Sequence, residues 1–279
     1  MTNLALGTNE IEFWNGVAAD RWVTHQAELD ARIAVYGRAA IDALRPVAGE
    51  RVLDVGCGCG DTVLTLAERV GAAGRVVGLD VSRRMLERAR ERARGATHVD
   101  LALEDAAVYR PSEPFDAICS RFGVMFFAKP VAAFANLRST LRPGGRMAFV
   151  CWRAIAENPW AAVPLGAALS VVPPPPPAPE GAPGPFAFAD EARVRAVLGE
   201  AGFADVTVTP FDAPMLLGET LEAALRYASE MGPAARLMSD LSPADSARVM
   251  AALEAALAPH GPRVALTGAV WVVSARRPD

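Results

Sequence analysis

The sequence predicts an α/β fold: a doubly wound, seven-stranded and mostly parallel sheet with an antiparallel last strand and added helical caps. Three observations carry this prediction. Short apolar runs alternate with amphipathic segments from residue 52 to about residue 210, as βαβ units do. A glycine-rich turn joins the first such run to the helical segment after it. A chain of 279 residues is also long enough for one large core.

The N-terminal part of the chain is expected to be helical. Apolar residues such as Trp14, Trp22 and Ile33 recur among charged residues over 11–44, which favours one amphipathic stretch. Trp14 and Trp22 are two helical turns apart and are expected to share a face.

The remaining elements follow from apolar periodicity and from turn residues. Strands are expected over residues 52–55, 75–79, 99–103, 115–120, 146–152, 206–210 and 264–275. Helices are expected over residues 61–70, 82–94, 130–141, 159–171, 190–202, 220–231 and 243–258. Residues 143–145 (Pro-Gly-Gly) predict a turn, and residues 173–185, dominated by proline and glycine, predict an extended loop.

This pattern divides the chain into a helical lid, residues 1–48, and a main domain, residues 49–279. The main domain is expected to carry insertions at about 153–189 and 216–261. Both insertions are rich in Leu, Ala, Met and Pro, which favours an apolar cap over a small or medium organic molecule.

Composition excludes several kinds of partner. The net charge of −4 gives no basic surface for nucleic acid, and no apolar run is long enough to span a bilayer. The four cysteines form no metal-binding CxxC pair, so no metal is expected and reduced thiols are favoured. We therefore expect a cytoplasmic protein, a monomer or homodimer, that acts on a small molecule without binding nucleic acid or membrane.

The most informative stretch is the glycine-rich turn after the first strand. Gly56, Gly58 and Gly60 alternate there, which lets the backbone approach a ligand closely, and the following helix offers its N-terminus. Asp80 ends the next apolar strand, about 20 residues further on, where an acid can accept both ribose hydroxyls of an adenosine cofactor.

The spacing of the turn separates two cofactors. Dinucleotide binding requires G-x-G-x-x-G, but Asp61 stands where the third glycine would sit. S-adenosylmethionine (SAM) has no pyrophosphate; its methionyl carboxylate and ammonium suit backbone amides and an acid such as Asp54. An NAD-dependent dehydrogenase is therefore disfavoured.

The turn, residues 54–60, resembles motif I of the class I SAM-dependent methyltransferases, which have a Rossmann-like fold. It is most similar to the small-molecule group that includes the ubiquinone and menaquinone methylating enzymes. Further stretches resemble later motifs of the family in the same order: residues 79–86, 103–106, 115–123, 141–146 and 201–203. The resemblance covers residues 52–210.

The resemblance implies roles for individual residues. Asp80 would bind the ribose, with Val81 and Met85 flanking the adenine. The other cofactor-binding residues expected, beside the motif I acid Asp54, are Trp22, Gly56, Cys57, Gly58, Asp105, Ala106, Ser120 and Arg121. Asp105 would accept from the adenine amino group, and Ser120 and Arg121 would lie near the sulfonium. Ala107 departs from the family, many members of which carry glutamine there.

The substrate side is less defined by the sequence. No catalytic residue is identified, because in-line methyl transfer depends mainly on positioning; His25 is a candidate base. The expected substrate-binding residues are Trp14, His25, Phe122, Trp152 and Trp160. Aromatic faces attract cations and line apolar pockets, although ordinary core packing is the alternative for each aromatic residue.

The sequence thus predicts a methyltransferase that moves a methyl group from SAM to O, N or C of a small metabolite, as in secondary metabolism, and releases S-adenosylhomocysteine. The alternative is a protein of the same fold that binds SAM without transferring methyl, as a pericyclic catalyst or a regulatory module. After the fourth strand, the chain lacks the Pro-Pro element of enzymes that methylate amino groups of DNA and glutamine.

Overall fold

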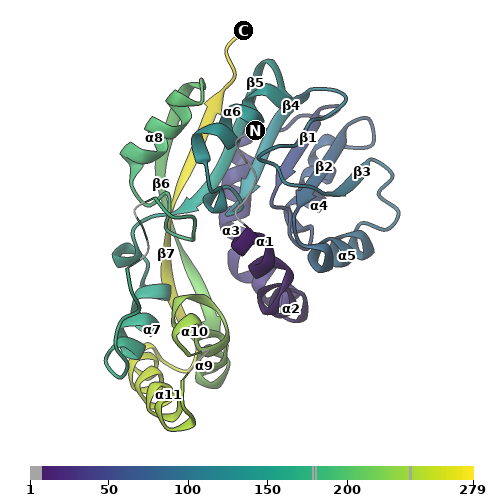
Figure 1. Cartoon of the computed structure of the whole chain (residues 1–279). Coiled ribbons are helices and arrows are strands. Elements are labelled where there is room, and N and C mark those ends of the chain that lie inside the picture. The colour runs from purple at the N-terminus through teal and green to yellow at the C-terminus, as the bar shows by residue number, and fades with distance from the viewer. Residues whose placement is uncertain (1–7, 178, 180, 239–240) are drawn as a thin grey trace. The chain divides into compact units, whose positions relative to one another are not determined.

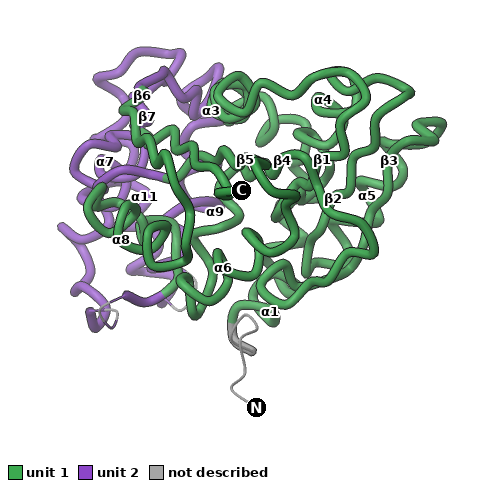
Figure 2. The backbone as a smooth tube through the Cα atoms, turned by 90° about the horizontal axis from the view of Figure 1, so that it is seen from above, with its two compact units in different colours: residues 1–151, 183–211, 270–279 green, residues 152–182, 212–269 purple. Residues whose placement is uncertain are grey.

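The computed structural model describes residues 8–177, 179, 181–238 and 241–279. The chain divides into two compact units, coloured separately in Figure 2. Unit 1 consists of Met1–Cys151, Pro183–Phe211 and Val270–Asp279. Unit 2 consists of Trp152–Ala182 and Asp212–Ala269.

The described residues form one seven-stranded sheet in the order β3-β2-β1-β4-β5-β7-β6 (Figure 1). Its strands are β1 (Arg51–Val55), β2 (Arg75–Asp80), β3 (Val99–Leu103), β4 (Phe115–Arg121), β5 (Leu141–Trp152), β6 (Ala204–Gly218) and β7 (Val264–Arg276). Strands β1 to β5 pair in parallel. Strand β6 leads from unit 1 into unit 2 and its neighbour β7 leads back, so β7 is antiparallel. The predicted doubly wound sheet is confirmed.

The strand order reverses at β1, and β1 lies between β2 and β4. The chain winds outward from β1 through β2 to β3, then crosses to β4 and winds the other way. Because such crossovers are right-handed, their helices cover opposite faces of the sheet. The unit 1 helices are α1 (Thr8–Asn15), α2 (Val17–Thr24), α3 (Gln26–Leu44), α4 (Asp61–Val70), α5 (Arg83–Arg92), α6 (Pro130–Thr140), α8 (Glu191–Glu200) and the 3-10 turn η1 (Val124–Phe126). Figure 2 shows α3 and α4 on one side of the sheet and α6 and α8 on the other.

The N-terminal stretch is not one helix, as the apolar spacing suggested, but three. Gly16 separates α1 from α2 with an extended ψ of −146°, and His25 separates α2 from α3 with a ψ of 21°. Glycine is the residue that loses most on entering a helix, apart from proline, so a break at Gly16 costs little. Trp14 and Trp22 nevertheless remain neighbours, with ring centroids 6.4 Å apart.

Strand β5 begins earlier than expected and absorbs the predicted turn at residues 143–145. Phe115 pairs with Leu141, whereas Ala117 pairs with Arg146. The extra residues of β5 therefore form a bulge opposite a single residue of β4. Gly144 takes a φ of 66° within it, a conformation that suits glycine. The glycine does take a turn-like backbone conformation, but pairing with β4 keeps residues 143–145 within β5, so the predicted separate turn was wrong.

Unit 2 contains a group of helices together with the last part of β6 and the first part of β7. Its helices are α7 (Pro159–Leu169), α9 (Leu221–Glu230), α10 (Gly232–Met238), α11 (Pro243–Leu257), η2 (Ile155–Glu157) and η3 (Ala258–His260). Helix α7 packs against α10 and α11, and α9 packs against the same two helices. The apolar periodicity did not predict α10, which follows α9 after a single residue.

Asn158 is the polar centre of unit 2. It is fully buried, and its Nδ2 donates to the carbonyls of Arg153 and Ala154 at 3.1 Å each. Its Oδ1 accepts from the Trp160 indole at 3.0 Å and from the Ala269 amide at 2.8 Å. One side chain thus joins the segment that leads into η2, helix α7 and strand β7.

We predict that Asn158→Ala lowers the free energy of unfolding by about 2–4 kcal/mol, since each buried polar group left unpaired costs about 1–3 kcal/mol. Denaturant unfolding followed by tryptophan fluorescence measures this. Ser170→Ala is the matched control, because its hydroxyl makes one exposed bond at the end of the same helix. Equal unfolding midpoints for the two variants would contradict the role assigned to Asn158.

Candidate functional site

The loop between β1 and α4 has a backbone that only glycine adopts without strain. Gly56, Gly58 and Gly60 have φ angles of 69°, 52° and 86°. A Cβ on Gly56 would lie 2.8 Å from Cα of Gly123, in the turn after β4. The two loops therefore approach each other backbone to backbone. Within the β1 loop, the Gly56 and Cys57 amides donate to the Leu79 carbonyl at 2.9 and 3.0 Å, and the Gly60 amide donates to the Cys57 carbonyl at 2.9 Å.

Asp80, at the end of β2, holds this loop from the neighbouring strand. Its Oδ2 accepts from the Gly58 amide at 2.7 Å, and its Oδ1 accepts from the Ser82 amide at 2.8 Å. Burial raises the pKa of Asp80, and the bonds from these two amides oppose the rise. The acid predicted to bind a ribose thus also fixes the turn on either side of that position.

Asp54, inside β1, is a second buried acid beneath the loop. It is fully buried, and Thr62 Oγ1 donates to its Oδ2. Its Oδ1 is buried without a hydrogen-bond partner, an arrangement that costs free energy unless a donor arrives. Burial raises the pKa of Asp54 to about 7. An ammonium group is a suitable missing donor.

Ser120 ties the end of β4 to the end of β1. Its buried hydroxyl donates to the Val55 carbonyl at 2.8 Å and accepts from the Gly123 amide at 3.2 Å. A Cβ on Gly123 would lie 2.5 Å from the same carbonyl oxygen, so this position requires glycine. Phe122 between them has a φ of 63°, a strained conformation for an aromatic residue.

Arg121 belongs to an ion-pair network that the sequence did not indicate. Its guanidinium contacts Asp61 at 2.6 Å and Asp30 at 3.1 Å. Arg92 also contacts Asp30, at 2.8 Å, and donates to the Cys59 carbonyl at 2.7 Å. The four charged side chains come from α3, α4, α5 and β4. These ion pairs hold α3 against the segment that follows the glycine loop. They also engage the guanidinium of Arg121, the residue that was expected near the sulfonium.

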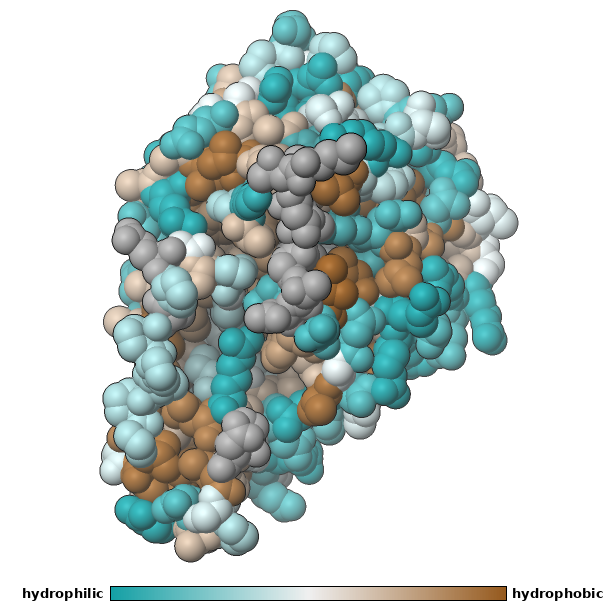
Figure 3. Space-filling view, in the orientation of Figure 1, coloured by the Kyte–Doolittle hydropathy of each residue, from teal (hydrophilic) through white to brown (hydrophobic). Residues whose placement is uncertain are grey.

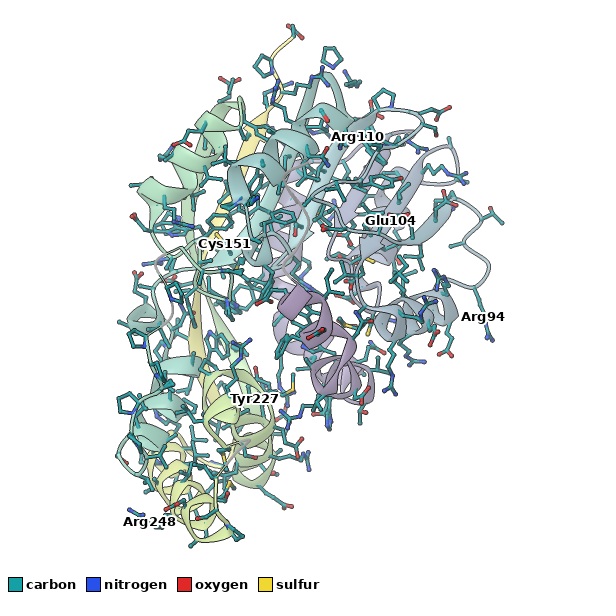
Figure 4. All side chains as sticks on the ribbon, in the orientation of Figure 1. Arg94, Glu104, Arg110, Cys151, Tyr227 and Arg248 are labelled. Atoms are coloured by element: carbon teal, nitrogen blue, oxygen red, sulfur yellow. The ribbon has the colours of Figure 1, made fainter. Side chains whose placement is uncertain are left out.

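The loop after β3 borders the same sheet edge. Asp105 Oδ1 accepts from the Ala107 amide at 2.9 Å, and the Glu104 amide donates to the Asp80 carbonyl at 3.1 Å; Figure 4 labels Glu104 there. Asn136 of α6 donates to the Ala106 carbonyl at 3.0 Å. The loop is therefore anchored by its own turn and by a helix of the other layer.

Val81 and Met85 lie on the β2 side of the site. The Val81 carbonyl accepts from Asn15 of α1 at 2.9 Å. The Met85 thioether would be 3.8 Å from a Cβ on Gly58. Both residues thus flank the junction of the glycine loop with the acid at the end of β2, and Asn15 is a neighbour that sequence reasoning missed.

The predicted aromatic residues divide between the two units. In unit 1, the Trp14 ring contacts Phe126 of η1 at 5.1 Å, and Phe122 contacts the buried Tyr36 at 6.0 Å. In unit 2, Trp152 and Trp160 lie 4.8 Å apart. His25 is half-buried between α2 and α3. Phe126 and Tyr36 were not predicted; both continue aromatic clusters that form only in three dimensions.

The cysteines are buried, and Cys57 lies inside the loop. A Cβ on Gly78 would be 2.9 Å from the Cys57 sulfur. The Cys57 side chain therefore packs against β2, and only its backbone forms part of the glycine loop. Burial raises the pKa of all four thiols.

No group of three or more metal-binding side chains gathers in the described part of the chain. None of its helices has the length and apolarity needed to cross a membrane.

Comparison with known proteins agrees with this geometry. Residues 52–145 match the model of a methyltransferase domain. The chain is 40% identical to aklanonic acid methyltransferase of a Streptomyces species over 116 residues, 40% of this chain and 53% of that protein. It is 31% identical to nocamycin O-methyltransferase of Saccharothrix syringae over 214 residues, 70% of this chain and 69% of that protein. The match to the first of these relatives thus spans about half of its length.

A solved structure shares the fold. It is phosphoethanolamine N-methyltransferase 2 of Haemonchus contortus in complex with phosphomonomethylethanolamine and S-adenosylhomocysteine, with a TM-score of 0.57 and 15% identity over 95% of this chain and 60% of that one. The motif order, the sheet and the long match to the nocamycin enzyme lead to one conclusion. The chain belongs to the class I SAM-dependent methyltransferases.

Proposed function

We propose that this protein transfers the methyl group of SAM to a small organic metabolite and releases S-adenosylhomocysteine. One observation carries the proposal: the glycine loop lies between two buried acids, Asp54 and Asp80, of which one has an unpartnered oxygen and the other ends the neighbouring strand. Family membership supplies the identity of the cofactor.

The residues present fit SAM. The N-terminus of α4, directly after the glycine loop, offers backbone amides for a carboxylate, and Asp54 Oδ1 is a buried acceptor for an ammonium. Asp80 keeps free lone pairs for ribose hydroxyls, because each of its oxygens accepts one amide. When bound, SAM supplies a methyl group on an electron-poor sulfonium. The protein's contribution is to hold the donor and the acceptor in line and to exclude water.

The acceptor side favours an apolar molecule. We propose that residues 1–48 serve as a lid and that the insertions at about 153–189 and 216–261 serve as a cap. Trp14, Trp22 and Phe126 form one aromatic cluster, and Trp152 and Trp160 form another. On the face seen in Figure 3, hydrophobic side chains gather over the helices of unit 2. The relative that matches over two thirds of its length is named an O-methyltransferase, so oxygen acceptors are the first to test.

The deciding experiment is calorimetric titration with SAM, S-adenosylhomocysteine and NADH, followed by a screen of small, largely apolar molecules that carry oxygen acceptors. We expect both adenosyl ligands to bind in the micromolar range, NADH not to bind, and S-adenosylhomocysteine to form with at least one acceptor. Failure to bind the adenosyl ligands would overturn the proposal. Tight binding without product across a broad screen would favour the non-transferring alternative.

We predict that Asp80→Asn weakens S-adenosylhomocysteine binding about 10-fold to 100-fold, because a hydrogen bond to a charged group contributes about 1.5–3 kcal/mol. Asp116→Asn is the matched control. The Asp116 carboxylate also accepts a hydrogen bond from a backbone amide, that of Arg51, at 2.8 Å. It lies near the start of β4, however, whereas Asp80 lies at the end of β2. A variant at Asp80 that binds as well as the Asp116 variant would remove Asp80 from the site.

The pH dependence of binding should report on Asp54. Because burial raises its pKa to about 7, the ligand-free protein loses the charged form as the pH falls below that value. Binding of S-adenosylhomocysteine should then weaken by up to about tenfold for each pH unit. In Asp54→Asn the binding is weaker at high pH, and its pH profile is flatter. A wild-type profile that is flat between about pH 8 and pH 5.5 would contradict the assignment.

The pH dependence of stability should run opposite to that of binding: the charged form of Asp54 favours ligand binding but lowers the stability of the ligand-free protein. A raised pKa in the folded state means that the contribution of Asp54 to stability is present at low pH and is lost as the pH rises through about 7. Asp54→Asn should therefore raise the melting temperature of the ligand-free protein at high pH and change it less at low pH. A scanning calorimetry series measures this; a lower melting temperature at high pH would contradict it.

A further inference from the structure

We propose that Asn15 is a positioning residue for the cofactor site and acts through Asp80. The inference rests on the proposed function, because it takes Asp80 as the ribose-binding acid. Asn15 is the last residue of α1, far in sequence from every family motif.

The carboxamide of Asn15 brackets one turn on both sides. Its Nδ2 donates to the Val81 carbonyl at 2.9 Å, and its Oδ1 accepts from the Arg83 amide at 3.2 Å. The same Nδ2 also donates to the Ile11 carbonyl, one turn back in α1, at 2.8 Å. The side chain therefore connects the end of α1 to the two peptide groups that flank Ser82. An amide can do this because it carries both a donor and an acceptor.

Ser82 passes this constraint on to the site. Its amide donates to Asp80 Oδ1 at 2.8 Å, and its hydroxyl caps α5 through the Met85 amide at 3.5 Å. The other oxygen of Asp80 accepts from the Gly58 amide at 2.7 Å. Four groups are thus linked in sequence: Asn15, the turn at Ser82, the acid, and the glycine loop. The orientation of the Asp80 carboxylate depends on where that turn is held.

Other contacts hold the N-terminal helices in place without Asn15. Arg84, Arg88 and Arg92 follow at four-residue intervals along one face of α5. They pair in order with Asp20 of α2, with Gln26 at 3.3 Å and with Asp30 of α3 at 2.8 Å. Arg94, beyond the end of α5, points away from the fold (Figure 4). Removal of the Asn15 carboxamide should therefore leave α2 and α3 docked, and α1 keeps the ring contact between Trp14 and Phe126.

The position of α1 also fits a role over the cofactor. Asn15 contacts the turn after β2, and its neighbour Trp14 contacts Phe126 in the turn after β4. Because β1 lies between β2 and β4 in the sheet, α1 bridges the two turns that flank the glycine loop. The carboxamide is the polar part of that bridge.

The test compares Asn15→Ala with the wild type in calorimetric titrations of the full chain with S-adenosylhomocysteine and with 5′-methylthioadenosine. We expect both affinities to fall by the same factor, about threefold to tenfold, as for the loss of one or two hydrogen bonds. The factor should be equal because both ligands carry the ribose, whereas only one carries the amino-acid end. Val17→Ala, at a residue that is 65% exposed at the start of α2, is the matched control and should bind as the wild type does.

A double-mutant cycle with Asp80→Asn gives a readout that a purely structural role would not produce. If Asn15 acts through the Asp80 carboxylate, Asn15→Ala should cost much less in that background. Unchanged binding in the single variant, a loss confined to S-adenosylhomocysteine, or full additivity in the cycle would each overturn the proposal. A wild-type protein that binds neither ligand would instead overturn the proposed function, so the two failures are distinguishable.

Discussion

The hydrogen bond from the Gly58 amide to the buried Asp80 carboxylate joins the loop after β1 to the end of β2, and the rest of the site is arranged around this junction. The bond requires a left-handed backbone at Gly58, which glycine supplies without strain. It also requires an acid that still accepts hydrogen bonds when buried; burial raises the pKa of Asp80, and its amide donors oppose that rise. The family's two sequence signals, alternating glycines and a strand-terminal acid, are thus two ends of one physical contact.

The buried acids show how binding and stability oppose each other in this molecule. Asp54 keeps one oxygen unpartnered in the interior, an arrangement that costs stability in the free protein and provides an acceptor for an ammonium. Sites for charged ligands commonly carry such strain. Phe122, with its positive φ beside Ser120, is a second strained position at the same sheet edge, and the close approach of Gly56 to Gly123 explains why the turn has little room to relax.

The N-terminal helices are attached to this edge of the sheet by ion pairs. Helices α2 and α3 are docked by a row of arginines on α5 and by the network of Asp30, Asp61, Arg92 and Arg121. The four side chains of this network are partly buried and have two ion-pair partners each, so they define position better than isolated surface pairs do. Arg121, which family resemblance placed near a sulfonium, holds α3 against α4 in this structure. Its role toward a cofactor stays a prediction, as do the roles of His25 and the tryptophans.

The sequence by itself determined the doubly wound sheet and the position of the loop, because strand and helix periodicity and the glycine pattern are local properties that survive without knowledge of the fold. It also indicated Asp54 and Asp80, since Asp54 lies within one recognisable strand and Asp80 ends the next. It placed the turn at 143–145 and a single N-terminal helix incorrectly, because pairing with β4 and a break at Gly16 override local preference. Only the tertiary structure brought together Asn15 with Val81, Asn158 with Ala269, and Arg121 with Asp30. These contacts join residues 66, 111 and 91 positions apart, and no local pattern encodes a hydrogen bond between groups that only the folded chain makes neighbours.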